Sequence, residues 1–316
     1  MTVSVVAELG RLARRAAHRQ PCPGCASTEI VLAERADGVV VRHQGVVAKA
    51  HALGTDSAGL AARVAVAAHP ALAGILLPPL MPPTERLPGR AVTAWPYGTP
   101  VNPAEPDAAP WEEAAQLLAR LHRVDPADMG GLPPMRGPAK AARAVARMRA
   151  ANSPGAAEVL RAWARLPAWA RDEAPVPAPD ARRLCHGDLH LGQLVRHPAD
   201  RGDWLLIDVD DLGLGDPAWD LARPAAWYAA GLLAPDVWSR FLGSYRAAGG
   251  PAVRPEGDPW PELDVPARAL TVQTAALALV KSAAENRDLD DAERLMFDAC
   301  ARIASLPTEL WSTTTS

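Results

Sequence analysis

Apolar and polar positions alternate over much of the first hundred residues, and this alternation predicts a small lobe of β-strands. Five runs rich in β-branched and other apolar residues are bounded by turn residues: 29–35, 39–43, 46–50, 74–80 and 89–95. Asp37-Gly38 separates the first two runs and is a strong hairpin signal. Helices over 3–19 and 56–68 complete the lobe, and Thr55 or Asp56 would cap the second helix. We therefore expect a mostly antiparallel N-terminal lobe over residues 1–98.

The apolar period changes to that of helices after a Pro-rich hinge or linker over residues 99–110. The helices predicted by this spacing are 111–123, 138–150, 156–166, 218–231, 235–247, 265–285 and 289–305. Two short β-like pieces, 193–196 and 204–209, interrupt them, and a Pro-rich loop covers 251–266. The pattern indicates an α+β protein with two lobes, in which a larger helical C-lobe spans residues 111–316.

Composition argues against several classes of protein, namely nucleic-acid binders, membrane proteins and disulfide-stabilised secreted proteins. The 33 Lys and Arg residues against 36 Asp and Glu give a net charge of −3, which argues against a general nucleic-acid binder. The apolar runs are too short for a membrane span, and the N-terminus lacks the order of a secretory signal. Four cysteines make no disulfide framework, so we expect a reduced, cytoplasmic enzyme without membrane attachment. Lysine is rare, so each of Lys49, Lys140 and Lys281 merits attention.

The segment that carries recognisable chemistry runs from residue 184 to residue 222. It holds His186-Gly-Asp188, then Gln193 five residues later, and Asp208 at the end of an apolar run. In phosphoryl transfer one carboxylate orients the attacking hydroxyl and takes its proton, while an amide and a second carboxylate hold Mg²⁺ on the nucleotide phosphates. The spacing of these side chains therefore indicates a phosphotransferase.

These motifs resemble those of the aminoglycoside phosphotransferase and choline kinase superfamily, whose members are relatives of the protein kinases. The likeness covers roughly residues 29–305 and rests on His-Gly-Asp-x-His-x-x-(Asn), Ile-Asp and Gly-Asp-Pro-x-x-Asp-Leu-Ala. Leu117–His122 also resembles the helix that precedes the catalytic loop. The resemblance implies a protein-kinase-like fold and the cofactors ATP (or GTP) and Mg²⁺.

The resemblance also implies a role for each matching residue. Asp188 would be the catalytic base or hydroxyl-positioning group, and Gln193 and Asp208 would bind the metal. The residues that would support the catalytic loop by hydrogen bonds are His186, His190 and Asp220.

Lys49 is the candidate for binding the nucleotide phosphates. It ends Val46-Val-Ala-Lys49 on the third predicted strand, which matches the kinase pattern Val-Ala-Ile-Lys; the alternative is a solvated edge residue. The hairpin at Asp37 and Gly38 takes the place of the Gly-rich loop. The base would lie against backbone groups near Trp95 and Tyr97, whose rings are as well explained as core residues.

Two departures from the family pattern affect these assignments. Residues 57–68 contain no acid to pair with the lysine; Ala61 or Ala62 stands where the glutamate is expected, and Asp56 is the nearest carboxylate. Gln193 replaces the usual Asn, as in the His-Leu-Gly-Gln loop of the maltokinase and glucosamine-kinase branch.

Two further acids, Asp210 and Asp211, follow Asp208. They are candidate metal ligands or polar caps of the loop. We favour Asp210 as a ligand, because a side chain two residues on faces the same way if the strand continues.

Three other features leave alternatives open. Cys22-Pro-Gly-Cys25 has metal-knuckle or redox spacing and His18 would add a third ligand, but a zinc site needs four, so two free thiols in a turn is the favoured interpretation. A basic stripe on one predicted helix would bind an anionic acceptor or an acidic peptide, or would simply be a solvated face. An acidic run near the C-terminus would bind a polycationic substrate, or would cap the last helix. The stripe is Arg136, Lys140, Arg143 and Arg147, and the run is Asp288, Asp290, Asp291 and Glu293.

The sequence therefore predicts an ATP- (or GTP-) and Mg²⁺-dependent O-phosphotransferase. Its acceptor would be the hydroxyl of a small molecule: an aminoglycoside, amino sugar, sugar or other natural product. One alternative is a kinase acting on Ser or Thr of a peptide. Another is a nucleotide-binding pseudokinase that serves a protein partner, against which the intact Asp188 and Asp208 weigh.

Overall fold

The computed structural model describes residues 4–18, 28–35, 38–87, 89–176 and 182–306. Asp37, Cys22 and Cys25 lie outside the described residues. The chain forms two compact units. The first comprises residues 1–110, 124–133 and 191–210, and the second comprises residues 111–123, 134–190 and 211–316.

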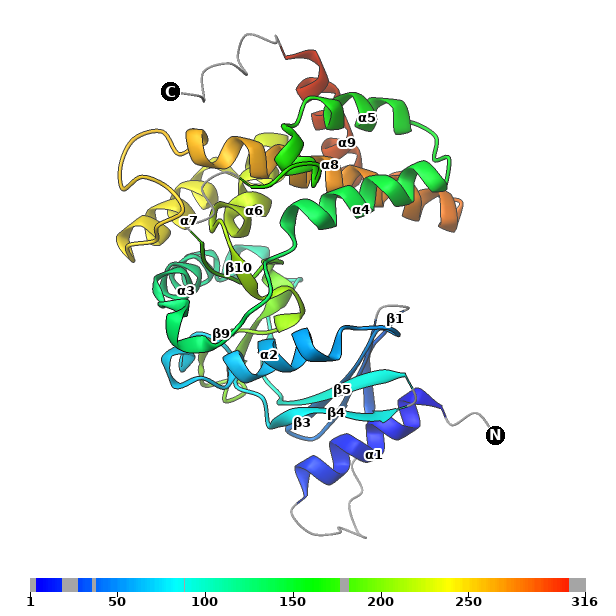
Figure 1. The fold of residues 1–316 in the computed structure, drawn as a ribbon, viewed down its shortest axis with the longest axis vertical. Coiled ribbons are helices and arrows are strands. Elements are labelled where there is room, and N and C mark those ends of the chain that lie inside the picture. The colour runs from blue at the N-terminus through cyan, green and yellow to red at the C-terminus, as the bar shows by residue number, and fades with distance from the viewer. Residues whose placement is uncertain (1–3, 19–27, 36–37, 88, 177–181, 307–316) are drawn as a thin grey trace. The chain divides into compact units, whose positions relative to one another are not determined.

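A five-stranded antiparallel sheet with the strand order β1-β2-β3-β5-β4 dominates the first unit (Figure 1). Its strands are β1 (Ile30–Arg35), β2 (Gly38–His43), β3 (Val46–His51), β4 (Met81–Leu87) and β5 (Arg90–Pro96). Helix α1 (Val5–Ala17) packs its apolar side on one face of this sheet. Helix α2 (Ser57–Ala67) lies on the other side of the sheet. The Asp56 carboxylate caps α2 by accepting a hydrogen bond from the Ala58 N–H at 3.1 Å.

The alternation along β3 decides where its polar side chains point. Ala48 and Ala50 are fully buried in the core that α1 covers. Since side chains alternate along a strand, Lys49 and His51 project from the opposite face. Lys49 stands across from Thr93 of β5 in the register.

The strand predicted over residues 74–80 is wrong, because this segment forms turns and the next strand, β4, begins at Met81. The apolar run at 74–80 is buried because it packs beside Leu206 and not because it is a strand of the main sheet. Leu77 donates its N–H to Leu206 at 2.9 Å and Ile75 accepts the N–H of Leu206 at 2.9 Å. The prolines that follow fit β4, since it is an edge strand and an edge tolerates missing N–H groups.

A second sheet in the first unit has the order β6-β8-β9. Its strands are β6 (Thr99–Pro100), β8 (Leu194–His197) and β9 (Asp203–Leu206). The strand predicted over 204–209 is too long, because β9 ends at Leu206 and a 3-10 turn spans Val209–Asp211. The condition on which Asp210 was favoured as a ligand is therefore not met. Asp208 has a φ of 63°, so the chain changes direction at this residue.

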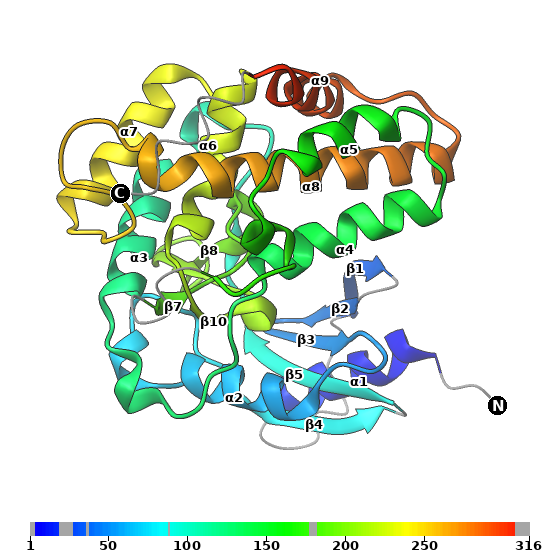
Figure 2. The same ribbon diagram turned by 45° about the horizontal axis from the view of Figure 1, so that its top comes forward.

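Helices form most of the second unit. They are α3 (Trp111–Arg123), α4 (Gly137–Ala150), α5 (Ala156–Ala164), α6 (Ala218–Ala230), α7 (Pro235–Ala247), α8 (Trp260–Glu285) and α9 (Asp291–Ser305). Figure 2 shows α8 crossing the unit beside α4 and α9. The short strands β7 (Arg183–Cys185) and β10 (Gly213–Gly215) pair antiparallel and hold the segment that leads into the catalytic loop.

The predicted boundary between the loop 251–266 and the helix 265–285 is wrong, since α8 already begins at Trp260. Pro261 occupies the first turn, where a missing N–H costs nothing, and Pro266 is buried inside the helix. Among the described residues α8 alone is long and apolar enough to cross a membrane. Because 67% of its apolar stretch is buried inside the protein, it has the surroundings of a core helix.

Candidate active site

Lys49 pairs with two carboxylates in the first unit. Its Nζ lies 2.7 Å from Asp208 Oδ1 and 2.9 Å from Asp210 Oδ2. Burial lowers the pKa of Lys49, but the two carboxylates raise it more, and the net pKa is above its usual value. The ammonium therefore stays charged. These acids stand in for the glutamate that α2 lacks, while Asp56 serves as a helix cap.

His51 is a functional candidate that the sequence reasoning missed. Its Nδ1 lies 3.2 Å from Asp210 Oδ1, and its Nε2 lies 3.0 Å from Thr93 Oγ1. Thr93 Oγ1 in turn accepts the indole N–H of Trp95 at 2.9 Å. Burial raises the pKa of Asp210. The His51 hydrogen bond and the Lys49 charge lower this pKa by more than burial raises it, so the net pKa is below its usual value. The available signal was the position of His51, two residues after Lys49 on one face of a strand.

Gln193 and Asp208 lie at neighbouring strand ends. The backbone oxygen of Gln193 accepts the N–H of Ile207 at 2.9 Å, and Leu194 pairs with Leu206 in the register of β8 and β9. Carboxylate and amide oxygens are the ligands that Mg²⁺ takes in proteins. The donor set of Gln193, Asp208 and Asp210 therefore fits this ion.

The remaining residues predicted for the nucleotide are engaged within the first unit. The Arg42 guanidinium lies 3.3 Å from the centre of the Tyr97 ring. The Tyr97 N–H donates to Gly45, and its carbonyl lies 3.1 Å from His197 Nδ1. Gly38 begins β2 opposite His51. Tyr97 thus has contacts within the first unit, and its place beside the nucleotide base stays a prediction.

Asp188 lies between two cations in the second unit. Lys140 Nζ is 3.1 Å and Arg223 Nη2 is 2.9 Å from the same oxygen, Oδ1. Arg223 also donates its Nε–H to the Leu189 carbonyl at 2.9 Å. Burial raises the pKa of Asp188, but Lys140 and Arg223 lower it more, with a smaller effect from His190. The carboxylate is therefore ionised at neutral pH.

Asp220 holds the backbone of the catalytic loop. Its carboxylate accepts N–H hydrogen bonds from His186 at 2.6 Å and Gly187 at 2.7 Å, and His122 Nε2 lies 2.9 Å away. Gly187 has a φ of 81°, and a Cβ there would lie 2.4 Å from the Asp211 carbonyl oxygen. Only glycine fits this position without a backbone shift, which explains the residue between His186 and Asp188.

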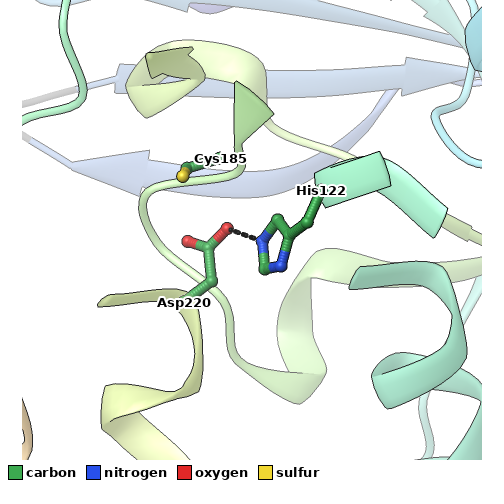
Figure 3. Close-up of side chains that lie close together, drawn as sticks. All are labelled: His122, Cys185 and Asp220. Carbon is green, nitrogen blue, oxygen red and sulfur yellow. Dashed lines mark hydrogen bonds and ion pairs between the residues drawn. The ribbon is translucent and has the colours of Figure 1, made fainter. Parts of the chain in front are cut away.

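His122, Cys185 and Asp220 form a buried cluster whose side chains have the types that bind metals (Figure 3). His122 and Asp220 are bound to each other, and His122 Nδ1 lies 2.8 Å from the Tyr245 hydroxyl. Burial and the Asp220 charge raise the pKa of Cys185 well above its usual value, so the thiol stays protonated and is a poor ligand. We interpret the cluster as a structural support for the loop.

The structure separates the basic stripe from the acidic run. Asp211 binds Lys140 at 2.8 Å and also binds Arg136, whereas Arg143 and Arg147 further along α4 are exposed. In the acidic run Asp290 accepts the Glu293 N–H at 2.8 Å and forms a capping box with it. Asp290 and Glu293 therefore cap α9, which is one of the two interpretations of this run.

The fold is the protein-kinase-like, two-lobed α+β fold, as predicted. The profile described as the phosphotransferase enzyme family matches residues 23–263, and the chain belongs to this family. No curated protein matches the chain.

Solved structures with the same fold share little sequence. A choline/ethanolamine kinase family protein from Mesorhizobium loti is 16% identical over 97% of this chain and 99% of its own, with a TM-score of 0.57. A macrolide 2'-phosphotransferase from Brachybacterium faecium is 21% identical, and the match covers 95% of this chain and 99% of that protein, with a TM-score of 0.52. A spectinomycin phosphotransferase in complex with ADP and spectinomycin is 15% identical, and the match covers 91% of this chain and 93% of that protein, with a TM-score of 0.57.

Proposed function

We propose that the protein is an ATP- (or GTP-) dependent, Mg²⁺-requiring kinase that phosphorylates a hydroxyl group of a small molecule in the cytoplasm. The observation that carries this proposal is the cation-held, ionised Asp188 in the chain order of the family motif, together with the Lys49–Asp208–Asp210 group. The ADP in the spectinomycin phosphotransferase supports the choice of nucleotide. A pseudokinase is disfavoured, since Asp188 and Asp208 are both present.

Lys49 would bind the nucleotide phosphates as a compact point charge. Asp208, Asp210 and Gln193 would hold Mg²⁺, which supplies charge neutralisation at the phosphate oxygens when bound. His51 would keep Asp210 in place when phosphates compete for Lys49, because its hydrogen bond to the carboxylate does not depend on the lysine.

Asp188 would receive the acceptor hydroxyl through Oδ2, because both cations lie on Oδ1. Its lowered pKa makes it a weak base in the ground state. That suits phosphoryl transfer, whose loose transition state requires an oriented nucleophile more than an early proton removal. Asp188 is then chiefly an orienting group that takes the proton late.

The charges around Asp188 favour a neutral or anionic acceptor over a polycationic one. Lys140 and Arg223 contact the carboxylate itself, and Arg143 and Arg147 continue the cationic stripe of Lys140 along α4. In the acidic run at 288–293, Asp290 caps α9 and Glu293 pairs with Arg287 at 2.6 Å, so these two charges are already engaged. Sugars, sugar acids and acidic natural products are therefore preferred candidates.

An acceptor panel tests this proposal. The full chain is incubated with Mg-ATP or Mg-GTP and with polycationic aminoglycosides, amino sugars, neutral sugars, sugar acids and hydroxylated peptides, and products are identified by mass. We expect a phosphomonoester of a neutral or acidic acceptor. Nucleotide binding seen by thermal shift, without phosphorylation of any acceptor or water, would contradict the enzymatic function. An aminoglycoside as the best acceptor would contradict only the charge preference.

A further inference from the structure

Arg35 shares one face of the main sheet with Lys49. It is the last residue of β1 and pairs with Gly38 of β2, which in turn pairs with His51 of β3. Residues that stand opposite each other on antiparallel strands share a face, and so do residues two apart along one strand. Arg35, His51 and Lys49 therefore belong to one face of the sheet, opposite the face that α1 covers.

Gly38 leaves open space between Arg35 and His51. A Cβ at Gly38 would have one described atom within 4 Å, the Ala50 carbonyl oxygen, apart from the neighbours of Gly38 in the chain. Adjacent strands of a sheet lie about 4.8 Å apart, a distance that the long arginine side chain spans. The guanidinium of Arg35 can therefore extend over the backbone of β2, toward the side of β3 that carries Lys49.

The side chain of Arg35 has no partner among the described residues. It takes part in no hydrogen bond or ion pair there, and the residue is exposed at the edge of the sheet. Arg42 belongs to the same face, but its guanidinium lies 3.3 Å from the centre of the Tyr97 ring and donates to the Gln44 carbonyl at 2.7 Å. Arg35, unlike Arg42, thus keeps all of its N–H donors for a ligand.

The order of residues along β3 gives Arg35 a place relative to the nucleotide. The base is predicted near Trp95, which pairs with Val47, and the phosphates are predicted at Lys49, two residues further along β3. The row that contains His51 and Arg35 lies two residues beyond Lys49. A triphosphate that follows this order would bring its last phosphates to that row. The charge of Lys49 is shared with two carboxylates, so the terminal phosphates require a further cation.

We propose that Arg35 binds the terminal phosphates of the nucleotide and so makes the site prefer a triphosphate to a monophosphate. A guanidinium suits this task because it donates two parallel N–H hydrogen bonds to phosphate oxygens. The proposal rests on the proposed function, since it assigns another ligand to the same nucleotide. Arg35 holds and orients the phosphates and takes no part in proton transfer.

Calorimetric titration of the full chain with nucleotides tests this role. Mg-ATP and AMP, or Mg-GTP and GMP, are titrated into the wild type, Arg35→Met, Arg35→Lys and the control Arg201→Met. We expect Arg35→Met to bind the triphosphate about 10-fold more weakly or worse and the monophosphate unchanged. Arg35→Lys should recover part of the loss, because it keeps the charge but not the paired donors. Arg201→Met, at an exposed turn between β8 and β9, should bind like the wild type.

Two results would overturn the role of Arg35. One is an Arg35→Met protein that binds the triphosphate as tightly as Arg201→Met does. The other is an equal loss for triphosphate and monophosphate, which would indicate a general disturbance of the site. Binding of the monophosphate also reports that the variant is folded.

Failure of this proposal is distinguishable from failure of the proposed function. A wild-type chain that binds no nucleotide would contradict both. Triphosphate binding that weakens in Lys49→Met but not in Arg35→Met would contradict only the role of Arg35.

Discussion

At the scale of single residues, two of the rare lysines differ in how far their contacts could be predicted from the sequence. Lys49 binds two acids, Asp208 and Asp210, and its role was predictable from a motif on a strand. Lys140 likewise binds two acids, Asp188 and Asp211, but no motif marks it. It contacts residues 48 and 71 positions away, and such contacts depend on how α4 packs. Arg223 is not marked by a motif either, because its contact with Asp188 depends on how α6 packs.

Substitution of Lys140 by Met should change the pH dependence of the reaction. The pKa of Asp188 is below its usual value partly because of this ammonium, so the ionised form persists as the pH falls. Without Lys140 the pKa rises, and the acidic limb of kcat should move to higher pH. The measurement is a kcat profile over acidic to neutral pH. Arg149→Met, an exposed position on the same helix, is the control, and an unchanged limb in Lys140→Met would contradict the role.

Substitution of Lys49 should weaken use of the nucleotide. Lys49→Met removes the proposed phosphate ligand, and we expect kcat/KM for the nucleotide to fall by about 10²-fold or more, a loss of ~3 kcal/mol of transition-state stabilisation. Lys49→Arg should restore little, because a planar guanidinium does not reproduce a compact ammonium between two acids. Steady-state kinetics with varied nucleotide checks this. Wild-type kcat/KM in Lys49→Met would show that the lysine is only a structural partner of Asp208.

At the scale of elements, alternation and helical period identified the helices and most of the longer strands but missed β4 (Met81–Leu87) and the shortest strands. Strands β6, β7 and β10 have two or three residues each, too few to show a period. The apolar run at 74–80 was misassigned, because burial against Leu206 and burial within a strand leave the same pattern. The catalytic loop was recognised by its motif, whereas its support from His122 and Tyr245 depends on distant helices.

The catalytic loop should not tolerate a side chain at Gly187. Gly187→Ala would place a Cβ 2.4 Å from the Asp211 carbonyl oxygen at a positive φ. We expect a loss of stability of ~2 kcal/mol or more and a large loss of kcat. Urea unfolding and kinetics measure both. Gly243→Ala in α7, where no atom outside the backbone of the same helix lies within 4 Å of the added Cβ, should not destabilise the chain. Equal behaviour of the two variants would contradict the role of the turn.

The start of α9 offers a separate test of the acidic run. Asp290→Ala removes the capping hydrogen bond to Glu293 and should lower the free energy of unfolding by about 1 kcal/mol without changing acceptor preference. Asp288→Ala, an exposed neighbour outside the helix, is the matched control. A changed acceptor preference in Asp290→Ala would instead indicate that this carboxylate binds the substrate.

At the scale of the whole molecule, the proposed chemistry is divided between the two units. The first unit holds Lys49, Asp208 and Asp210, and the second holds Asp188 with its two cations. The change from strand to helix patterning near residue 110 is visible in the sequence. The inclusion of residues 191–210 in the first unit is not, since it follows from pairing of β8 with β6 nearly a hundred residues earlier.

The most direct test of the account is the rate of phosphate transfer by Asp188→Asn to the acceptor that the panel identifies. Asn keeps the size of the side chain but cannot take the proton and loses the charge that Lys140 and Arg223 hold. We expect kcat to fall by about 10²- to 10⁴-fold while nucleotide binding by thermal shift is retained. Asp236→Asn, an exposed aspartate on α7, should keep full activity. Wild-type turnover by Asp188→Asn would contradict the account.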